Sequence, residues 1–330
     1  IKNLTIRSTV DFSTNSTKLD YYQSAYLLGS SYTGNKSTPF LKSVDAYRAS
    51  GFGYNTYWST TASYNWDITD KMNLNAVAGY DFEYNSAFNV RQDDRTDADN
   101  PIAYLGTSIK NVMGANLWTG SSSNTNYVFD AMFTRLIFNY DSKYVLSGSL
   151  RRDRSSKFGP DNRAGLFYSA SGAWNITEES WMKPLTWLSL AKVRASYGVT
   201  ENDQIGSNYA WISTIKTDHN VVFGTSSIPS YYPGGYSNRE LGWEKNKQYD
   251  LGIDLAFFNR INLNVDLYKR TSDIVMPANI PNFNGIASSV YMNSGQVENK
   301  GIELSLNAKV LQGAFNWETT LNWSMNKNKI

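Results

Sequence analysis

The chain has 330 residues, a formal net charge of +2 at neutral pH and no cysteine. So small a net charge gives no reason to expect a nucleic acid partner, and without cysteine neither disulfides nor thiolate metal sites can form. The mean hydropathy is −0.46, and no apolar run approaches the roughly 18 residues of a transmembrane helix. Transmembrane β-strands are not excluded, because they need only alternate over about 9–11 residues.

Aromatic residues make up 15% of the chain, with 23 Tyr and 10 Trp. The aromatic girdles of a membrane barrel are one physical reason for such a surplus. The chain opens at Ile1 with no initiator Met, charged n-region or apolar h-region. We therefore expect it to be a segment from within a longer protein.

About eleven segments alternate between apolar and polar residues, which is typical of strands with two different faces. In the fifth segment, for example, apolar residues at even positions alternate with Ser147, Ser149 and Arg151, so we expect one face in lipid and one in a polar lumen. In chain order the segments are Leu4–Phe12, Trp58–Ile68, Leu74–Phe82, Val128–Tyr140, Tyr144–Arg151, Leu166–Ile176, Ala191–Val199, Tyr249–Phe257, Ile261–Leu267, Ile302–Ala308 and Phe315–Met325.

One connection is predicted to be helical. The segment from Thr177 to Leu188 has Thr177 in position to cap a short helix, with Glu178 and Glu179 in its first turn.

The links between the predicted strands alternate in length. Short links fall near Thr69, Ser142, Asn259 and Gly313, and long links cover 13–51, 85–127, 154–165, 200–247 and 272–300. Outer-membrane barrels alternate short periplasmic turns with long extracellular loops, whereas a soluble sandwich has no reason to do so. An odd number of antiparallel strands cannot close a barrel. Either neighbouring strands lie outside this chain, or one more strand lies within Tyr21–Leu28 or Asn208–Ile215.

Four stretches carry a family resemblance. They are RLIFNYDSKYVLSGSLRRDRSSKFGPDNRAGLFYSASGAWNITEESWM (Arg135–Met182), LAKVRASYGVTEN (Leu190–Asn202), ELGWEKNKQYDLGIDLAFFNRINLNVDLYKRTSDIV (Glu240–Val275) and NSGQVENKGIELSLN (Asn293–Asn307). Together they resemble the barrel of SusC-like TonB-dependent transporters.

The resemblance implies an all-β fold in which residues 1–330 are a segment of a transmembrane antiparallel β-barrel. The whole barrel would have about 22 strands and a plugged lumen, with the plug and the closing strands outside this chain. It also implies a location in the outer membrane of a Gram-negative bacterium, no cofactor and no enzymatic activity.

The function implied by the resemblance is active import of oligosaccharides or peptides. A SusD-like surface lipoprotein would form the lid, and the TonB–ExbB–ExbD complex would supply energy through an N-terminal region that this chain lacks. A dimer of transporter–lid pairs is a further expectation. The alternatives are a structural or adhesive barrel without transport, TonB-dependent uptake of an iron-siderophore or cobalamin-type ligand, and a soluble glycan-binding β-protein.

Aromatic residues of the predicted loops are the candidates for substrate contact, because a flat apolar ring with a polar edge suits sugars and peptide side chains alike. The alternative is that these rings pack within the loops or contact the lid. The candidates are Trp118, Tyr209, Trp211, Tyr231, Tyr232 and Tyr236.

An acidic stretch is a weak candidate for calcium. Asp93, Asp94, Asp97 and Asp99 could gather oxygen ligands, but their spacing lacks the glycine of a calcium loop of the EF-hand type, which favours a solvated acidic loop. The single histidine, His219, lies in a polar stretch and gives no metal site with so few partners.

Overall fold

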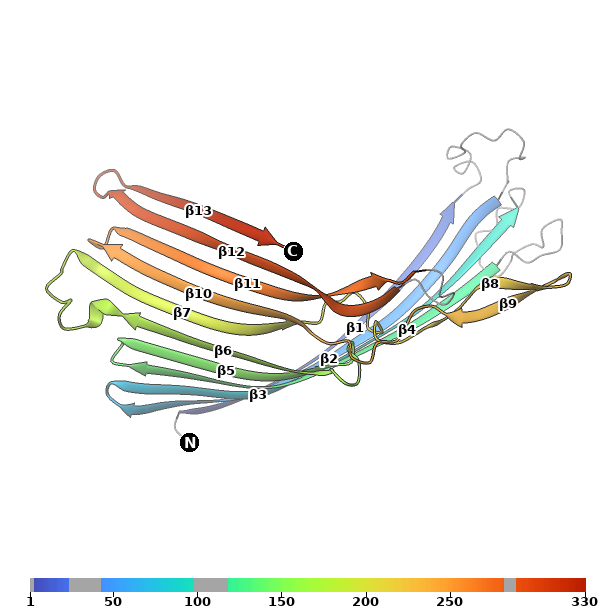
Figure 1. The fold of residues 1–330 in the computed structure, drawn as a ribbon, viewed down its shortest axis with the longest axis horizontal. Helices are drawn as coiled ribbons and strands as arrows, with labels where there is room; N and C mark the ends of the chain where they lie inside the picture. Colours follow the sequence, from blue (N-terminus) through green and yellow to red (C-terminus); the bar gives the residue numbers. More distant parts are fainter. Residues whose placement is uncertain (1–2, 24–42, 98–117, 282–288) are drawn as a thin grey trace. The chain divides into compact units, whose positions relative to one another are not determined.

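The computed structural model describes residues 3–23, 43–97, 118–281 and 289–330, and the fold is all-β. An eleven-stranded antiparallel sheet has the order β1-β2-β3-β4-β5-β6-β7-β10-β11-β12-β13, and β8 pairs only with β9 (Figure 1). Within the described residues the two end strands, β1 and β13, do not pair, so the sheet is open, consistent with a partial barrel. The strands are β1 (Leu4–Gln23), β2 (Ser43–Thr69), β3 (Met72–Asp97), β4 (Trp118–Tyr140), β5 (Tyr144–Ser155), β6 (Ala164–Asn175), β7 (Leu188–Asn202), β8 (Ile215–Phe223), β9 (Ser226–Pro233), β10 (Glu244–Phe257), β11 (Ile261–Asn279), β12 (Ser289–Leu311) and β13 (Trp317–Lys329).

The chain divides into two compact units. Unit 1 comprises residues 1–9, 58–82 and 128–330, and unit 2 comprises residues 10–57 and 83–127. In unit 2 the ring of Tyr54 lies between Phe12 and Tyr84, with centroids 6.4 and 5.6 Å away, and Arg48 pairs with Asp20. The features that bear on function lie in unit 1.

All eleven predicted segments lie in strands of the main sheet, so the all-β prediction is confirmed, but the structure describes two further strands, β8 and β9, that were not predicted. The strands of unit 2 are longer than predicted, because β2 begins at Ser43, β3 ends at Asp97 and β4 begins at Trp118. Parts of the predicted long links 13–51 and 85–127 are therefore strand. The predicted link 200–247 contains the β8–β9 hairpin, whereas the possible extra strand at Asn208–Ile215 is turn and coil up to the first residue of β8.

The predicted helix from Thr177 to Leu188 is wrong. Only a short 3-10 helix, η2 (Ile176–Glu178), forms, with Asn175 rather than Thr177 at its N-cap. The rest is a chain of tight turns in which the amide of Met182 donates to the Glu179 carbonyl and that of Leu185 to the Met182 carbonyl. Pro184 has no amide hydrogen to continue a helical ladder. No helix in the described part of the chain is long and apolar enough to cross a membrane.

Strand β5 has its apolar side chains on its more exposed face. Leu146 and Leu150 are 56% and 45% exposed, whereas the intervening odd positions, including Ser147 and Ser149, are half-buried. A soluble antiparallel sheet packs its apolar face on a core and turns its polar face to water. The arrangement in β5 is the reverse, as expected for a strand whose outer face meets lipid.

Candidate functional site

The polar face of unit 1 carries hydrogen-bonded pairs of side chains that join neighbouring strands. On β5 and β6, the hydroxyls of Ser147 and Ser171 are 2.7 Å apart and those of Ser149 and Ser169 are 2.6 Å apart. On β7, the Ser196 hydroxyl donates to the Asp250 carboxylate of β10 over 3.0 Å. Each of these residues lies directly opposite its partner in the strand register. Since side chains alternate between the two faces along a strand, all of them lie on the same face of the sheet.

An ion-paired arginine joins three strands of this face. The Arg194 guanidinium of β7 lies 3.2 Å from the Asp254 carboxylate of β10 and 2.6 Å from the Asp266 carboxylate of β11. The guanidinium passes directly over Gly252, where an added Cβ would come within 2.4 Å of its central carbon. Gly252 therefore leaves the space in which Arg194 crosses β10.

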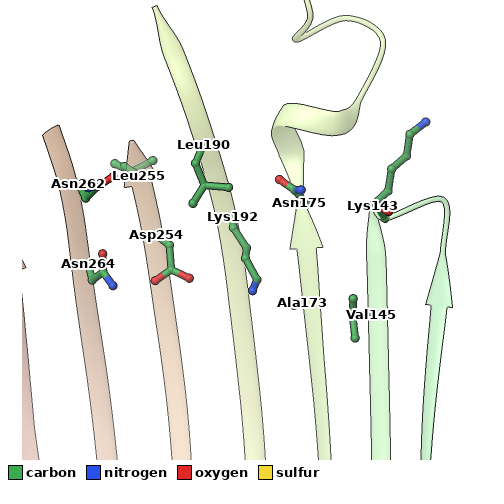
Figure 2. A pocket seen from close by; sticks show the side chains of 11 residues that line it. Lys143, Val145, Ala173, Asn175, Leu190, Lys192, Asp254, Leu255, Asn262 and Asn264 are labelled. Carbon is green, nitrogen blue, oxygen red and sulfur yellow. The ribbon is translucent and has the colours of Figure 1, made fainter. Parts of the chain in front are cut away.

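A cavity of about 500 Å³ lies on the same face, near the ends of β6, β7 and β10. Figure 2 shows Lys192 and Asp254 extending from neighbouring strands, with Asn175 and Asn264 on either side. Its lining is a mixture of charged, amide, hydroxyl and aliphatic groups. We interpret it as the end of the polar face near the short turns.

The apolar face carries two rows of aromatic rings separated by aliphatic side chains. The upper row is the one nearer the long loops. It consists of Tyr168, Tyr197 and Tyr249, with ring centroids 6.1 and 4.5 Å apart. The lower row is the one nearer the short turns, and it contains two stacks. In the first, the ring centroids of Tyr140, Tyr144 and Trp174 are 6.2 and 6.4 Å apart, and in the second those of Trp187 and Phe257 are 6.0 Å apart.

The spacing of these rows fits a bilayer. On β10 the apolar residues run from Tyr249 to Phe257, about 26 Å along the strand, and the apolar band of an outer-membrane barrel is about 25 Å tall. The next residue on this face beyond Tyr249 of β10 is Lys247, and the next ones beyond Leu150 of β5 are Arg152 and Arg154. Charged residues therefore begin where this band of apolar side chains, the lipid-facing belt, ends.

The loop end of unit 1 is defined here as the end of the sheet that carries links 156–163, 203–214 and 234–243. It contains a buried cluster of Phe158, Phe167, Val199, Ala210, Leu241 and Trp243. The Trp243 ring lies 4.6 Å from Phe158 and 5.5 Å from Phe167, and its indole donates to the Arg163 carbonyl over 3.1 Å. Residues far apart in the chain thus form one small core beyond the aromatic belt.

Charged groups surround this core. The Arg151 Nε lies 2.7 Å from the fully buried Asp153 carboxylate, and its guanidinium also contacts Asp81 at 3.3 Å and Glu201 at 3.7 Å. The Lys157 ammonium lies 3.4 Å from the Asp203 carboxylate. Arg151 thus ties β5 to Asp81 of β3 and to Glu201 of β7, and the Lys157–Asp203 pair ties the loop after β5 to the loop after β7.

The turn end of unit 1, where links 70–71, 141–143, 176–187, 258–260 and 312–316 lie, has a different charged group. The Glu179 carboxylate accepts hydrogen bonds from the Tyr144 hydroxyl at 2.6 Å and the Trp174 indole at 3.1 Å, and these lower its pKa below the ordinary value. Desolvation acts to lower the pKa of Lys143, but Asp141 and Glu179 raise it on balance.

The predicted substrate-contact residues fall into different environments. Trp211 is half-buried against the loop-end core, its indole donates to the Ser156 carbonyl over 3.3 Å, and Arg163 lies 5.2 Å above its ring. Tyr209 is adjacent to it in the same loop and is exposed. Tyr231 and Tyr232 lie on β9, where Tyr231 is 77% exposed, and Tyr236 lies in the irregular link after β9.

The other predicted residues that the structure describes lie on strands. Trp118 is the first residue of β4, and Asp93, Asp94 and Asp97 belong to β3, so their assignment to loops was wrong. Alternating hydrophobicity fades toward these strand ends, which is why the sequence did not indicate them. Asp99 lies outside the described residues. The loop-end core was missed altogether, since it is assembled from residues too far apart for any local pattern to reveal.

Strands with an outward apolar belt, two aromatic rows and an inward polar face define a segment of a transmembrane β-barrel. The chain belongs to the family described as TonB dependent receptor-like, beta-barrel, whose family model matches residues 2–329. It is SusC-like and an outer-membrane protein, as the resemblance in its sequence predicted.

Several known proteins resemble the chain over much of its length. TonB-dependent receptor P39 of Formosa agariphila is 34% identical over 81% of this chain and 25% of its own length. TonB-dependent receptor SusC of Bacteroides thetaiotaomicron is 32% identical over 60% of this chain and 20% of its own. The solved RagAB peptide transporter matches the fold with a TM-score of 0.84 at 24% identity, covering 100% of this chain and 35% of that one. The chain thus spans about a third or less of these proteins.

Proposed function

We propose that the chain forms part of the barrel wall of an outer-membrane importer that takes up oligosaccharides or peptides. In this proposal a SusD-like lipoprotein closes the barrel from outside, and the TonB–ExbB–ExbD complex supplies energy through other parts of the protein. The observation that carries the proposal is the family match along residues 2–329, combined with similarity to SusC at 32% identity.

The polar face supports a transport role over a purely structural one. It is lined by hydroxyls, carboxylates and the Arg194 ion-pair group, which keep the inner wall wettable. The fold similarity to the RagAB peptide transporter is the reason to keep peptides beside oligosaccharides as the substrate class.

Loop aromatics remain the proposed substrate contacts, with unequal support. Tyr231 and Tyr209 have the exposure that a contact with substrate needs, whereas the Trp211 ring is engaged by Arg163 and the loop-end core. Tyr232, Tyr236 and Trp118 complete the proposed set. The calcium site at Asp93, Asp94, Asp97 and Asp99 stays the weaker proposal.

The test is uptake by the full-length transporter in its own host. We expect deletion of the gene to abolish growth on particular oligosaccharides or peptides as sole nutrient, and expect a surface lipoprotein to co-purify with the transporter. Deletion of the TonB-coupling segment should have the same effect on growth as deletion of the gene. Normal growth on every such nutrient, with failure on ferric siderophores or cobalamin instead, would replace this proposal with the metal-chelate alternative.

A further inference from the structure

The connector between β6 and β7, residues Ile176–Trp187, differs from the other links at the turn end. The β2–β3 and β4–β5 links are the short polar turns Asp70–Lys71 and Asp141–Lys143, whereas the connector is the longest link at this end in the described structure (Figure 1). Its tight turns are closed by consecutive backbone hydrogen bonds. It is therefore a compact element with a surface of its own.

This surface is apolar and exposed. Trp181 is 61% exposed, and Leu185 and Trp187 are also exposed, whereas Met182 is the only buried side chain between Trp181 and Trp187. Single exposed apolar residues are normal on a protein surface, but two exposed indoles and a leucine on one short element form a larger apolar surface than a water-facing turn usually has.

Both ends of the connector are fixed to the lower aromatic row. At its start, Glu179 accepts hydrogen bonds from Tyr144 and Trp174, whose rings stack. At its end, Trp187 stacks on Phe257 with an interplanar angle of 3°, and its carbonyl accepts from the Phe258 amide. The connector thus begins and ends at the level where the lipid-facing belt stops.

The charges of the connector are paired within the protein. Lys183 lies 2.6 Å from Glu178, and Lys143 lies 3.6 Å from Glu179. Because these charges are paired within the protein, the exposed apolar side chains are the groups through which this surface would bind. Tryptophan is enriched at the headgroup level of membranes, where its ring is buried and its N–H stays wet.

We propose that the connector is an interfacial anchor that lies on the inner leaflet of the outer membrane, with Trp181 and Leu185 inserted at the boundary of headgroups and acyl chains. Continuity with the lower aromatic row favours a phospholipid surface over a partner protein as its occupant. Elements of this kind insert about 5–10 Å into the boundary. The inference rests on the outer-membrane placement of the family and not on the proposed import.

The test uses the full-length transporter, free of other cysteines, in nanodiscs with and without phospholipids brominated near the glycerol backbone. Separate variants Trp181→Cys and Leu185→Cys carry a small fluorophore, and Lys71→Cys on the polar β2–β3 turn is the matched control. Heat-modifiable migration on gels verifies that each barrel is folded. Aqueous iodide is the second quencher.

We expect brominated lipid to quench the probes at 181 and 185 at least about twofold more than the probe at 71, and iodide to show the reverse order. Iodide quenching at 181 and 185 equal to that at 71, without lipid quenching, would overturn the proposal. Protection from both quenchers would also overturn it, because it would place protein rather than lipid on the connector. The two positions are independent, so one variant that fails to fold leaves the other decisive. Loss of nutrient uptake is not a readout, so this test can fail while the proposed function stands.

Discussion

At the loop end of unit 1 the aromatic side chains of the core are buried, whereas at the turn end the tryptophans are exposed. Phe158 and Trp243 are buried against Leu241, and the nearby Asp153 is fully buried beside Arg151. At the turn end, Trp174, Trp181 and Trp187 keep much of their surface exposed, and the rings of Trp174 and Trp187 stack on those of Tyr144 and Phe257.

The difference follows from what surrounds each end. Loops that extend into water must bury their own apolar groups to be ordered, so they need a core. Residues at the level of a bilayer need no such core, because lipid covers the apolar surface and headgroups accept the polar edges of Tyr and Trp. The same residue types therefore hold loops together at one end and meet the membrane at the other.

The largest effect is expected from removing the centre of the loop-end core. Trp243→Ala should lower the free energy of unfolding of the loop end by about 3–5 kcal/mol, because it leaves a cavity beside Phe158 and Phe167. Hydrogen exchange of peptides covering 156–165 and 239–243 would measure the loss. Trp181→Ala at the turn end is the control and should leave these peptides unchanged. Equal protection in both variants would mean that the core does not order the loops.

A charge on the lipid-facing belt should be nearly as costly. Ile253→Arg places a guanidinium near the middle of the apolar face of β10, which is expected to cost about 2–4 kcal/mol in a bilayer. Ser196→Arg, on the polar face of the neighbouring strand, is the control and should be tolerated. Folding yield into phospholipid vesicles measures both. If the two variants fold equally well, the two faces do not have different solvents.

Gly159, in the loop formed by link 156–163, should resist substitution. A Cβ on Gly159 would come within 2.0 Å of the backbone oxygen of Arg239, so Gly159→Ala must push two loops apart. We expect a loss of about 1–3 kcal/mol, as for other overpacked sites. A Cβ added at Gly313 would have nothing within 4 Å. Gly313→Ala is therefore the matched control, and thermal unfolding of both variants is the measurement. A similar small shift in both would contradict the close packing of the loops.

The smallest effect is expected at Glu179 and depends on pH. Because the folded-state pKa of Glu179 lies below its ordinary value of 4.5, its contribution is present above that pH and lost as the pH falls through the lowered pKa. The protection of the connector amides, expressed relative to the intrinsic exchange rate at each pH, should therefore fall on acidification below about pH 4.5. In Glu179→Gln the exchange should be faster at neutral pH and should lose this dependence. An unchanged acid profile in the variant would show that another group controls the connector.

Local patterns were enough to predict the strands, and contacts between distant residues account for most of what was missed. Alternation in segments such as Tyr249–Phe257 is strong because two solvents act on opposite faces of each strand. The β8–β9 hairpin was missed although the two-residue link Gly224–Thr225, with Gly224 at φ 61°, is a turn signal that the apolar run before it could have supported.

The candidate site was less predictable than the strands. The exposed ring of Tyr231 agrees with its prediction as a loop aromatic, but the inward packing of Trp211 depends on Ser156 and Arg163, which lie about 50 residues away in the chain. The helix predicted after Thr177 failed because capping residues also suit tight turns, and Pro184 interrupts the backbone ladder.

The central claim is that the two faces of each strand in unit 1 meet different solvents. Spin labels introduced one at a time from Gln248 to Phe257 of β10, in the full-length transporter in bilayers, test it most directly. Accessibility to oxygen, which partitions into lipid, should peak at the odd positions, with a period of two residues. Accessibility to a water-soluble nickel complex should stay low there. High accessibility to the nickel complex at Leu251, Ile253 and Leu255 would contradict the account.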